Sequence, residues 1–243
     1  MANAEHVKIF KEGIPIWNKW RREHPEIIPD LRGSDLSGSD LRGSDLSGSD
    51  LRWSDLRGSN LSGSNLRGSN LSGSNLRGSN LSGSDLRWSD LSGSDLRWSN
   101  LSGSDLRWSD LSGSDLSGSN LRGSDLRGSD LRWSDLRWSD LSGSNLRGSN
   151  LSWSDLRWSD LSGSNLSGSN LRGSDLSGTS VIEVITLLPF TIVVMTDKRV
   201  RIGCGAPKTI KACLKYTEDE AFAKGLPRER YQLYRAILGG LLK

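Results

Sequence analysis

The chain has 243 residues and a formal net charge of +3. That length allows one or two globular domains, and the longest apolar run, Val184–Met195, is too short and too interrupted to span a bilayer. Residues 29–178 contain 16 Arg and 19 Asp, so the excess positive charge lies at the two ends. A nearly neutral middle excludes a continuous basic groove, and we expect neither a nucleic-acid partner nor a membrane.

Residues 4–24 predict an amphipathic helix. Apolar residues recur there at three- and four-residue steps, at Val7, Phe10, Ile14 and Trp17. Gly13 and Pro15 should bend or divide this helix. Ile27 and Ile28 follow between two prolines, and we expect them to cover the open end of the structure that begins at Pro29. Residues 1–28 are therefore predicted to be a cap.

From Leu31 to Leu176, leucine recurs at every fifth position, thirty times without interruption. Each unit reads Ser, then Asp or Asn, then Leu, then Arg or Ser, then Gly or Trp. On a helix, successive leucines would lie about 140° apart, and on a strand they would alternate between faces. A backbone that bends once per unit returns every leucine to the same inward direction, and Gly at most unit ends eases that bend. The period predicts a solenoid.

These units resemble those of the pentapeptide-repeat family, in which a central Leu or Phe follows Asp or Asn. The resemblance implies an all-β solenoid, a right-handed quadrilateral β-helix with four units per coil. Thirty units would give about 7.5 coils, over residues 29–180. It also implies that the central leucine and the residue two before it point inward.

The second inward column departs from the family, which commonly has Ala there. This chain has Ser in 29 of the 30 units and Pro29 in the first, which indicates an engineered or idealised member with caps of natural type. A buried hydroxyl without a partner costs about 1–3 kcal/mol. We therefore expect the serine hydroxyls to bond to backbone carbonyls.

Residues 181–243 predict a C-terminal cap of strands and helices. Val181–Thr196 is rich in β-branched residues and is split by Pro189; a turn at Thr196–Lys198 and a strand at Arg199–Gly203 should follow. Helices are expected over residues 207–215, 218–224 and 227–242. The last helix carries one apolar stripe, Tyr231, Tyr234, Leu238 and Leu241, with Ile237 beside it. We assign the stripe to the core of the cap, with a dimer through this end as the alternative.

Catalysis is not expected. The array has many Ser and Asp residues but no His, Lys or Glu to activate a nucleophile, and its rows of Asp, such as Asp35 and Asp55, should form ladders with Arg. Cys204 and Cys213 lie far in sequence from His6 and His24, so no metal-ligand spacing exists and no cofactor is expected. Two cysteines as free thiols fit a cytoplasmic protein.

Eight tryptophans occupy the fifth position of a unit, which family geometry makes outward. Three pairs are four units apart and should stack across one coil: Trp88 with Trp108, Trp133 with Trp153, and Trp138 with Trp158. We expect these rings to cover neighbouring glycines. The alternative is that four of them cluster at one corner as an interaction patch for self-association or a partner, made of Trp133, Trp138, Trp153, Trp158, Arg132, Arg137 and Arg157.

The sequence leaves three hypotheses for what the chain does. The favoured one is a non-catalytic structural scaffold. The second is a protein-binding module, since the family includes proteins that imitate duplex DNA and bind type II topoisomerases, although fold does not carry function. The third is a disordered low-complexity polymer.

Overall fold

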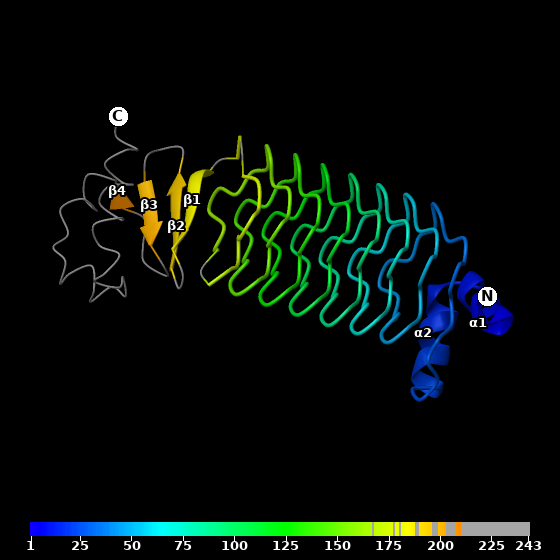
Figure 1. Cartoon of the computed structure of the whole chain (residues 1–243). Coiled ribbons are helices and arrows are strands. Elements are labelled where there is room, and N and C mark those ends of the chain that lie inside the picture. Colours follow the sequence, from blue (N-terminus) through cyan, green and yellow to red (C-terminus); the bar gives the residue numbers. More distant parts are fainter. Residues whose placement is uncertain are drawn as a thin grey trace.

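The computed structural model describes residues 1–166, 168–176 and 178–179 and the backbone of four strands beyond them. Two helices come first, α1 (Ala4–Lys11) and α2 (Ile14–Glu23). The strands are β1 (Val181–Leu187), β2 (Phe190–Met195), β3 (Arg199–Ile202) and β4 (Lys208–Thr209). Stacked coils lie between the helices and the strands, as Figure 1 shows. A disordered polymer is thereby excluded for the array.

The coils repeat every four units. Parallel bridges join each Asp or Asn to the equivalent residue four units later, from Asp30 with Asp50 to Asp155 with Asp175. Four units therefore make one coil. We number its faces by the first leucine of each: face 1 starts at Leu31, face 2 at Leu36, face 3 at Leu41 and face 4 at Leu46. Each unit contributes one bridge residue rather than an extended strand, so the array is a solenoid of bridges and turns.

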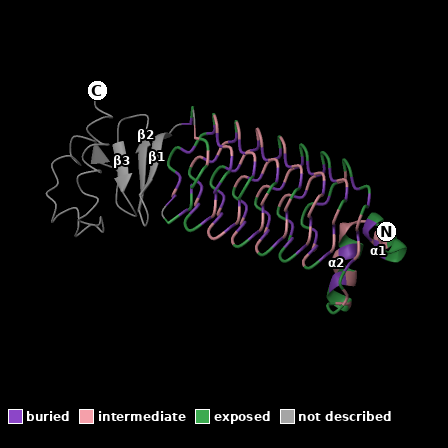
Figure 2. Cartoon of the chain, in the orientation of Figure 1, coloured by how far each residue is buried: buried purple, intermediate pink, exposed green. Residues whose placement is uncertain are grey.

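The leucine column forms the core. Every central leucine from Leu31 to Leu171 is between 0% and 4% exposed, and nearly all serines two positions earlier are buried beside them. Figure 2 shows the buried segments recurring along every coil. Both expected inward columns are confirmed, and only at the last unit is Leu176 partly exposed.

Three of the five backbone N–H groups of a unit bond to the adjacent coils, as unit 99–103 illustrates. Asn100 donates to the Ser79 carbonyl at 2.9 Å, Leu101 to the Asn120 carbonyl at 2.7 Å and Gly103 to the Arg122 carbonyl at 3.0 Å. The first bond runs back to the preceding coil, and the other two run forward to the following coil. They hold each coil between its two neighbours, as backbone groups excluded from water require.

The other two N–H groups are satisfied within the turn. Ser99 donates to the Leu96 carbonyl at 3.1 Å and closes a four-residue β-turn, while Ser102 donates to Oδ1 of Asn100 at 3.1 Å. The second bond is an Asx turn, which only Asp or Asn makes well. It explains why every unit has one of these two residues before its leucine.

The third residue of each β-turn is the fifth of a unit, and its φ is positive. The glycines there have φ of 61° to 70° and the eight tryptophans 59° to 63°. A positive φ at this position alone defines a type II turn, which favours Gly. Tryptophan in the left-handed region costs about 1–2 kcal/mol, so its rings must gain contacts that offset this strain.

Most serine hydroxyls of the second inward column bond to backbone carbonyls, as expected. Twenty-two of them donate to the leucine carbonyl three residues earlier, at 2.5–2.7 Å. The expectation is wrong for six buried hydroxyls without a partner, those of Ser44, Ser49, Ser74, Ser79, Ser119 and Ser144. The same leucine carbonyl already accepts the serine N–H, so the turn does not depend on the hydroxyl.

The N-terminal helices cap the edge of the first coil. On face 1, the Asp30 N–H donates to Nδ1 of His6 at 3.0 Å, and its carbonyl accepts the Asn3 N–H at 3.1 Å. On face 4, the Asp45 N–H donates to Oδ1 of Asn18 at 2.8 Å, and its carbonyl accepts Nε1–H of Trp17 at 2.7 Å. Helix residues thus replace a preceding coil on two faces.

The predicted division of the N-terminal helix at Gly13 is confirmed, but the residues expected to cover the coil are not the ones that do. Ile28 is 71% exposed, whereas Phe10 and Trp17 are buried against the leucine core. The aromatic rings lie edge to face, with centroids 4.8 Å apart. Their larger apolar area makes them the better cover, and Ile28 remains outside.

The C-terminal strands form one antiparallel sheet in the order β1-β2-β3-β4. The two strands expected on either side of Pro189 and the strand from Arg199 are confirmed. The helix expected from residue 207 is wrong at its start, because Lys208–Thr209 pairs with β3 instead. The remaining expected helices, with their stripe from Tyr231 to Leu241, and both cysteines lie outside the described residues.

The Asx turn can be tested at face 3. Asn100→Ala removes the acceptor of the Ser102 N–H, and we expect a loss of about 1 kcal/mol in the free energy of unfolding. Asn100→Asp keeps the acceptor and serves as the matched control. Urea unfolding followed by circular dichroism measures both; equal stability of the two variants would contradict the role given to this side chain.

Candidate interaction surface

The eight array tryptophans stand at the turns and are the large exposed hydrophobic side chains of the described part of the array. They are 48% to 73% exposed, which confirms that they point outward. They line three of the four turns: Trp53, Trp133 and Trp153 end face 1, Trp98, Trp138 and Trp158 end face 2, and Trp88 and Trp108 end face 4. Face 3 ends in glycine in every unit.

Each ring leans over the following coil. Where glycine stands at the same turn of that coil, the ring lies over it: carbons of Trp53 come within 2.4 Å of the position that a Cβ on Gly73 would take. The same arrangement occurs at Gly118, Gly128, Gly173 and Gly178, under Trp98, Trp108, Trp153 and Trp158. The expected cover of neighbouring glycines is confirmed, and it supplies contacts that offset the strained φ.

Where tryptophan stands at the same turn of the following coil, the rings stack. Centroids are 5.7 Å apart for Trp88 with Trp108, and 5.5 Å apart for both Trp133 with Trp153 and Trp138 with Trp158, with interplanar angles of 9° to 14°. All three predicted stacks are confirmed. Among Trp133, Trp138, Trp153 and Trp158 the ring contacts lie within the two stacked pairs, because successive units end at different turns of the coil. An interaction patch made of both pairs stays a prediction.

The three arginines of the expected patch are bound to carboxylates of their own units. Nη2 lies 2.5 Å from Oδ2 of Asp130 for Arg132, 2.5 Å from Asp135 for Arg137 and 2.7 Å from Asp155 for Arg157. Nε of Arg137 also approaches Asp155 on the next coil, at 3.7 Å. The tryptophan stack of face 2, Trp138 with Trp158, therefore flanks a row of alternating charges.

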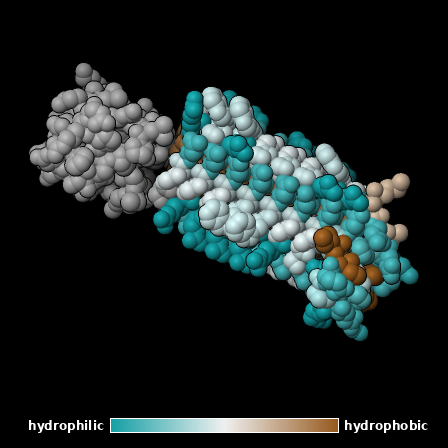
Figure 3. Space-filling model, turned by 60° about the horizontal axis from the view of Figure 1, so that its bottom comes forward, coloured by the Kyte–Doolittle hydropathy of each residue, from teal (hydrophilic) through white to brown (hydrophobic). Residues whose placement is uncertain are grey.

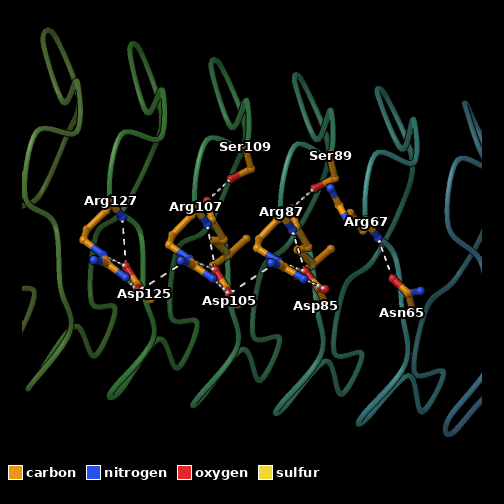
Figure 4. A network of polar contacts seen from close by, with 12 residues as sticks. Asn65, Arg67, Asp85, Arg87, Ser89, Asp105, Arg107, Ser109, Asp125 and Arg127 are labelled. Carbon is orange, nitrogen blue, oxygen red and sulfur yellow. Dashed lines mark hydrogen bonds and ion pairs between the residues drawn. The ribbon is translucent and has the colours of Figure 1, made fainter.

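The same ladder is seen on face 4 in Figure 4, where Asp85, Arg87, Asp105, Arg107 and Asp125 follow one another along the array. Pairs within a unit are 2.5 Å long, and contacts between coils are 3.6 Å and 3.8 Å. The expected Arg-linked ladder is confirmed. Its carboxylates are occupied by guanidinium groups, so they are not poised for acid or base chemistry.

Strongly apolar surface lies elsewhere. On the face shown in Figure 3 the array is teal to white, and the largest brown area lies at the end that carries α1 and α2. Exposed Ile16 and Ile28 belong to that end of the chain. A cavity of about 180 Å³ is also found there, between Phe10 and Ile14 of the helices and Leu36 and Leu41 of the first coil.

The described residues contain neither a metal-ligand cluster nor a helix that could span a membrane. Within those ranges, no three His, Cys, Asp or Glu side chains are grouped as a metal site requires. Neither α1 nor α2 has the length and apolar character needed to cross a bilayer, and these are the helices of the described residues.

The family model for pentapeptide repeats matches residues 30–63, 59–97, 99–137 and 149–184, which is more than half of the chain. The chain belongs to the pentapeptide-repeat family. Comparison with curated proteins finds no significant match. In this pentapeptide-repeat protein the Asx turns and the inward leucines account for the repeat itself.

Solved structures of other pentapeptide-repeat proteins are similar. HetL from Nostoc sp. strain PCC 7120, involved in heterocyst differentiation regulation, is 30% identical over 61% of this chain and 85% of its own, with a TM-score of 0.28. AT2G44920 from the Arabidopsis thaliana thylakoid lumen is 26% identical over 46% and 68%, with a TM-score of 0.28. QnrB1, a plasmid-mediated fluoroquinolone resistance protein, is 21% identical over 60% and 78%, with a TM-score of 0.41.

The cover of glycine by tryptophan can be measured with a matched pair of variants. Gly73→Ala places a Cβ against the ring of Trp53, whereas Gly78→Ala, at nearly the same positive φ, meets nothing within 4 Å. Both should lose about 1–2 kcal/mol from backbone strain. Only Gly73→Ala should also shift the Trp53 indole N–H resonance in an NMR spectrum. The interpretation fails if that resonance is the same in both variants.

Acid should destabilise the array through its ion pairs. The hydrogen bond from Arg32 lowers the pKa of Asp30 from 3.8 to about 2, and Arg87 likewise lowers the pKa of Asp85. A carboxyl whose pKa is lower in the folded state stabilises the fold above its unfolded pKa, and this contribution is lost as the pH falls toward the folded value. We expect the Tm to be constant from about pH 7 to 5 and to fall below about pH 4.

Because these carboxylates are partly exposed, the fall should be moderate and smaller in about 1 M salt, which screens the pairs. Thermal unfolding followed by circular dichroism across this range is the measurement. A Tm unchanged at pH 2.5, or one that already falls at pH 6, would show that other groups control the acid stability.

Proposed function

We propose that the chain is a non-catalytic structural scaffold. In this proposal residues 29–180 form a right-handed quadrilateral β-helix of about 7.5 coils, between an N-terminal cap at 1–28 and a C-terminal cap at 181–243. The observation that carries the proposal is that most polar groups of the array have their partners within the array. Backbone N–H groups bond to adjacent coils or Asx oxygens, and most of the arginines pair with their own aspartates.

The repeats themselves support an idealised sequence. The second inward position is Ser in 29 of 30 units, whereas the outward positions vary between two residues each. Near-identical units make one surface much like the next, so they provide rigidity and length rather than a unique cleft. Such a protein would serve as a spacer or support, and we place it in the cytoplasm because its two cysteines suit a reducing compartment.

The alternative is a protein-binding module that imitates DNA and acts on a type II topoisomerase. It would need a row of negative charge, and face 2 has one, Asp35, Asp55, Asp95, Asp115, Asp135, Asp155 and Asp175. Five arginines of the same face interrupt that row, and those at Arg57, Arg97, Arg137 and Arg157 are paired with it. The pairing favours the scaffold, because a polyanion mimic needs net charge.

A supercoiling assay with a purified type II topoisomerase separates the two functions. We expect no inhibition at micromolar protein, because four of the carboxylates of face 2, those of Asp55, Asp95, Asp135 and Asp155, are paired with arginines of their own units. A matched variant with Arg57, Arg77, Arg97, Arg137 and Arg157 changed to Ser, the residue that other units have there, exposes the acidic row. Inhibition by the unmodified protein at micromolar concentration or below would overturn the scaffold in favour of the binding module.

The tryptophan patch remains a prediction. Association of copies through Trp133, Trp138, Trp153 and Trp158, beside Arg132, Arg137 and Arg157, is tested by changing the four tryptophans to Gly and comparing sedimentation at high concentration. Identical sedimentation as monomers would leave the rings with the covering role alone.

A further inference from the structure

One unit of face 2 breaks a pattern that its neighbours share. Residues 94–98, 134–138 and 154–158 all read Ser-Asp-Leu-Arg-Trp. Between the first two, residues 114–118 read Ser-Asp-Leu-Ser-Gly. This unit keeps the carboxylate but lacks both the guanidinium and the indole that accompany it in the other three.

The indole of Trp138 has one face open toward this unit. Its other face is covered by Trp158, at a centroid distance of 5.5 Å and an interplanar angle of 12°. Trp133 serves as a reference, because its turn carries glycine on each of the three earlier coils and no ring can cover it from that side. Trp138 is 63% exposed and Trp133 is 66% exposed, so Trp138 is almost as open as this reference. Trp98 stands at the same turn two coils earlier. It therefore leaves uncovered the face of Trp138 that is turned toward residues 114–118.

The missing indole at Gly118 leaves a gap between Trp138 and Trp98. Trp98 lies on the side of this gap away from Trp138. Its ring carbons are 2.5 Å from the position that a Cβ on Gly118 would take, so the ring rests over the glycine. Where the following turn carries an indole instead of glycine, the ring lies parallel to that indole, as Trp133 does to Trp153 at a centroid distance of 5.5 Å, which shows a second position open to an indole at this kind of turn. Two coils span about 9.6 Å, which leaves room for one planar group in contact with a ring on either side.

The carboxylate beside this gap is the least engaged of the four. Asp95, Asp135 and Asp155 each pair with the arginine two residues on, and their side chains are 23%, 25% and 29% exposed. Asp115 is 39% exposed. Its Oδ1 accepts the hydroxyl of Ser117 at 2.7 Å and the Ser117 N–H at 3.0 Å, and its Oδ2 has a longer contact with Nε of Arg97, at 3.6 Å.

We propose that Trp98, Asp115 and Trp138 form a binding site for an arginine side chain of a partner peptide. The Trp98 ring takes the second position, and the guanidinium enters over Gly118, between the two indoles, and donates to Asp115. A guanidinium fits each part of the site, because it is planar, weakly hydrated, stacks on aromatic faces and pairs with carboxylates through two N–H groups. In the neighbouring units an arginine and a tryptophan stand at the positions of Ser117 and Gly118. The partner thereby supplies the guanidinium and the planar group that this unit lacks. This site is an addition to the scaffold role and does not depend on it.

The choice of arginine over other groups follows from the same chemistry. A lysine ammonium is a compact, strongly hydrated charge that cannot fill a flat space between two rings. A citrulline side chain has the same planar shape but no charge, so it loses the attraction to Asp115 and to the indole faces. The site should therefore require both planarity and positive charge.

The test is an NMR titration of the full chain, observing the indole N–H resonances, assigned with single Trp→Phe variants. The probes are N-acetyl-arginine amide, N-acetyl-lysine amide and N-acetyl-citrulline amide. We expect saturable shifts at Trp98 and Trp138 with the arginine probe, and binding at least about tenfold weaker with the other two. Absence of a saturable shift, or equal shifts at Trp53 and Trp88, would overturn the site.

Two variants and a control identify the groups. Gly118→Trp fills the gap with an indole, and Asp115→Asn removes the charge while keeping the Asx turn; both should abolish the shift. Gly113→Trp adds an indole at a face 1 turn, above Trp133, and should leave binding unchanged. Binding retained in Gly118→Trp or Asp115→Asn, or lost in Gly113→Trp, would refute the proposal.

Folding of the variants is checked by circular dichroism. Tryptophan already occupies eight such turns, and Asn occupies the Asp115 position in many units. If Gly118→Trp were not folded, Asp115→Asn would decide the question alone.

Discussion

One hydrogen bond makes the five-residue unit possible. The adjacent coils can satisfy three N–H groups of a unit and the β-turn a fourth, but the N–H directly after the leucine points to no other coil. The side chain of the preceding Asp or Asn accepts it, as Oδ1 of Asn100 does for Ser102. Without this acceptor the chain could not turn at every fifth residue and still bury its leucines, because orphaned backbone groups are costly.

The Asp or Asn before each leucine also determines the charge of the surface. Stacked coils bring equivalent side chains into rows about 4.8 Å apart, where like charges would repel. The array avoids this in two ways. Arginines stand between aspartates, as Arg87 does between Asp85 and Asp105, and asparagine replaces aspartate along part of face 3, from Asn60 to Asn120. Both solutions keep the Asx turn, so surface charge varies without any change in the fold.

The sequence predicted those features that depend on neighbours at a fixed separation. The inward Leu and Ser columns, the tryptophan pairs and the strands β1 to β3 follow from periodicity or local composition. The strained φ of the tryptophans could also have been predicted, since they share their position with glycine. Trp133 and Trp138 are one unit apart, which places their side chains at successive turns of the coil and each ring in a stack of its own.

The contacts of the N-terminal cap could not be predicted in the same way. His6, Asn18 and Arg21 bond to backbone groups of the first coil that are open only because no earlier coil exists. Nothing in the helix pattern indicates which polar residue meets which group. The prediction that Ile28 covers the end of the first coil failed for a related reason. It used only the apolar character of the residue and its place in the sequence, whereas in the structure Phe10 and Trp17 are buried there and Ile28 is exposed.

The four-unit spacing of the bridges also restricts how such a chain can change in length. Removing or inserting four consecutive units within the array deletes or adds one complete coil, and every leucine, Asx turn and cap still meets an equivalent neighbour. A change of one, two or three units keeps the leucines inward but carries everything after it to a different face. Insertions and deletions should therefore be accepted in whole coils, and the tryptophan columns would lose their alignment after any other change.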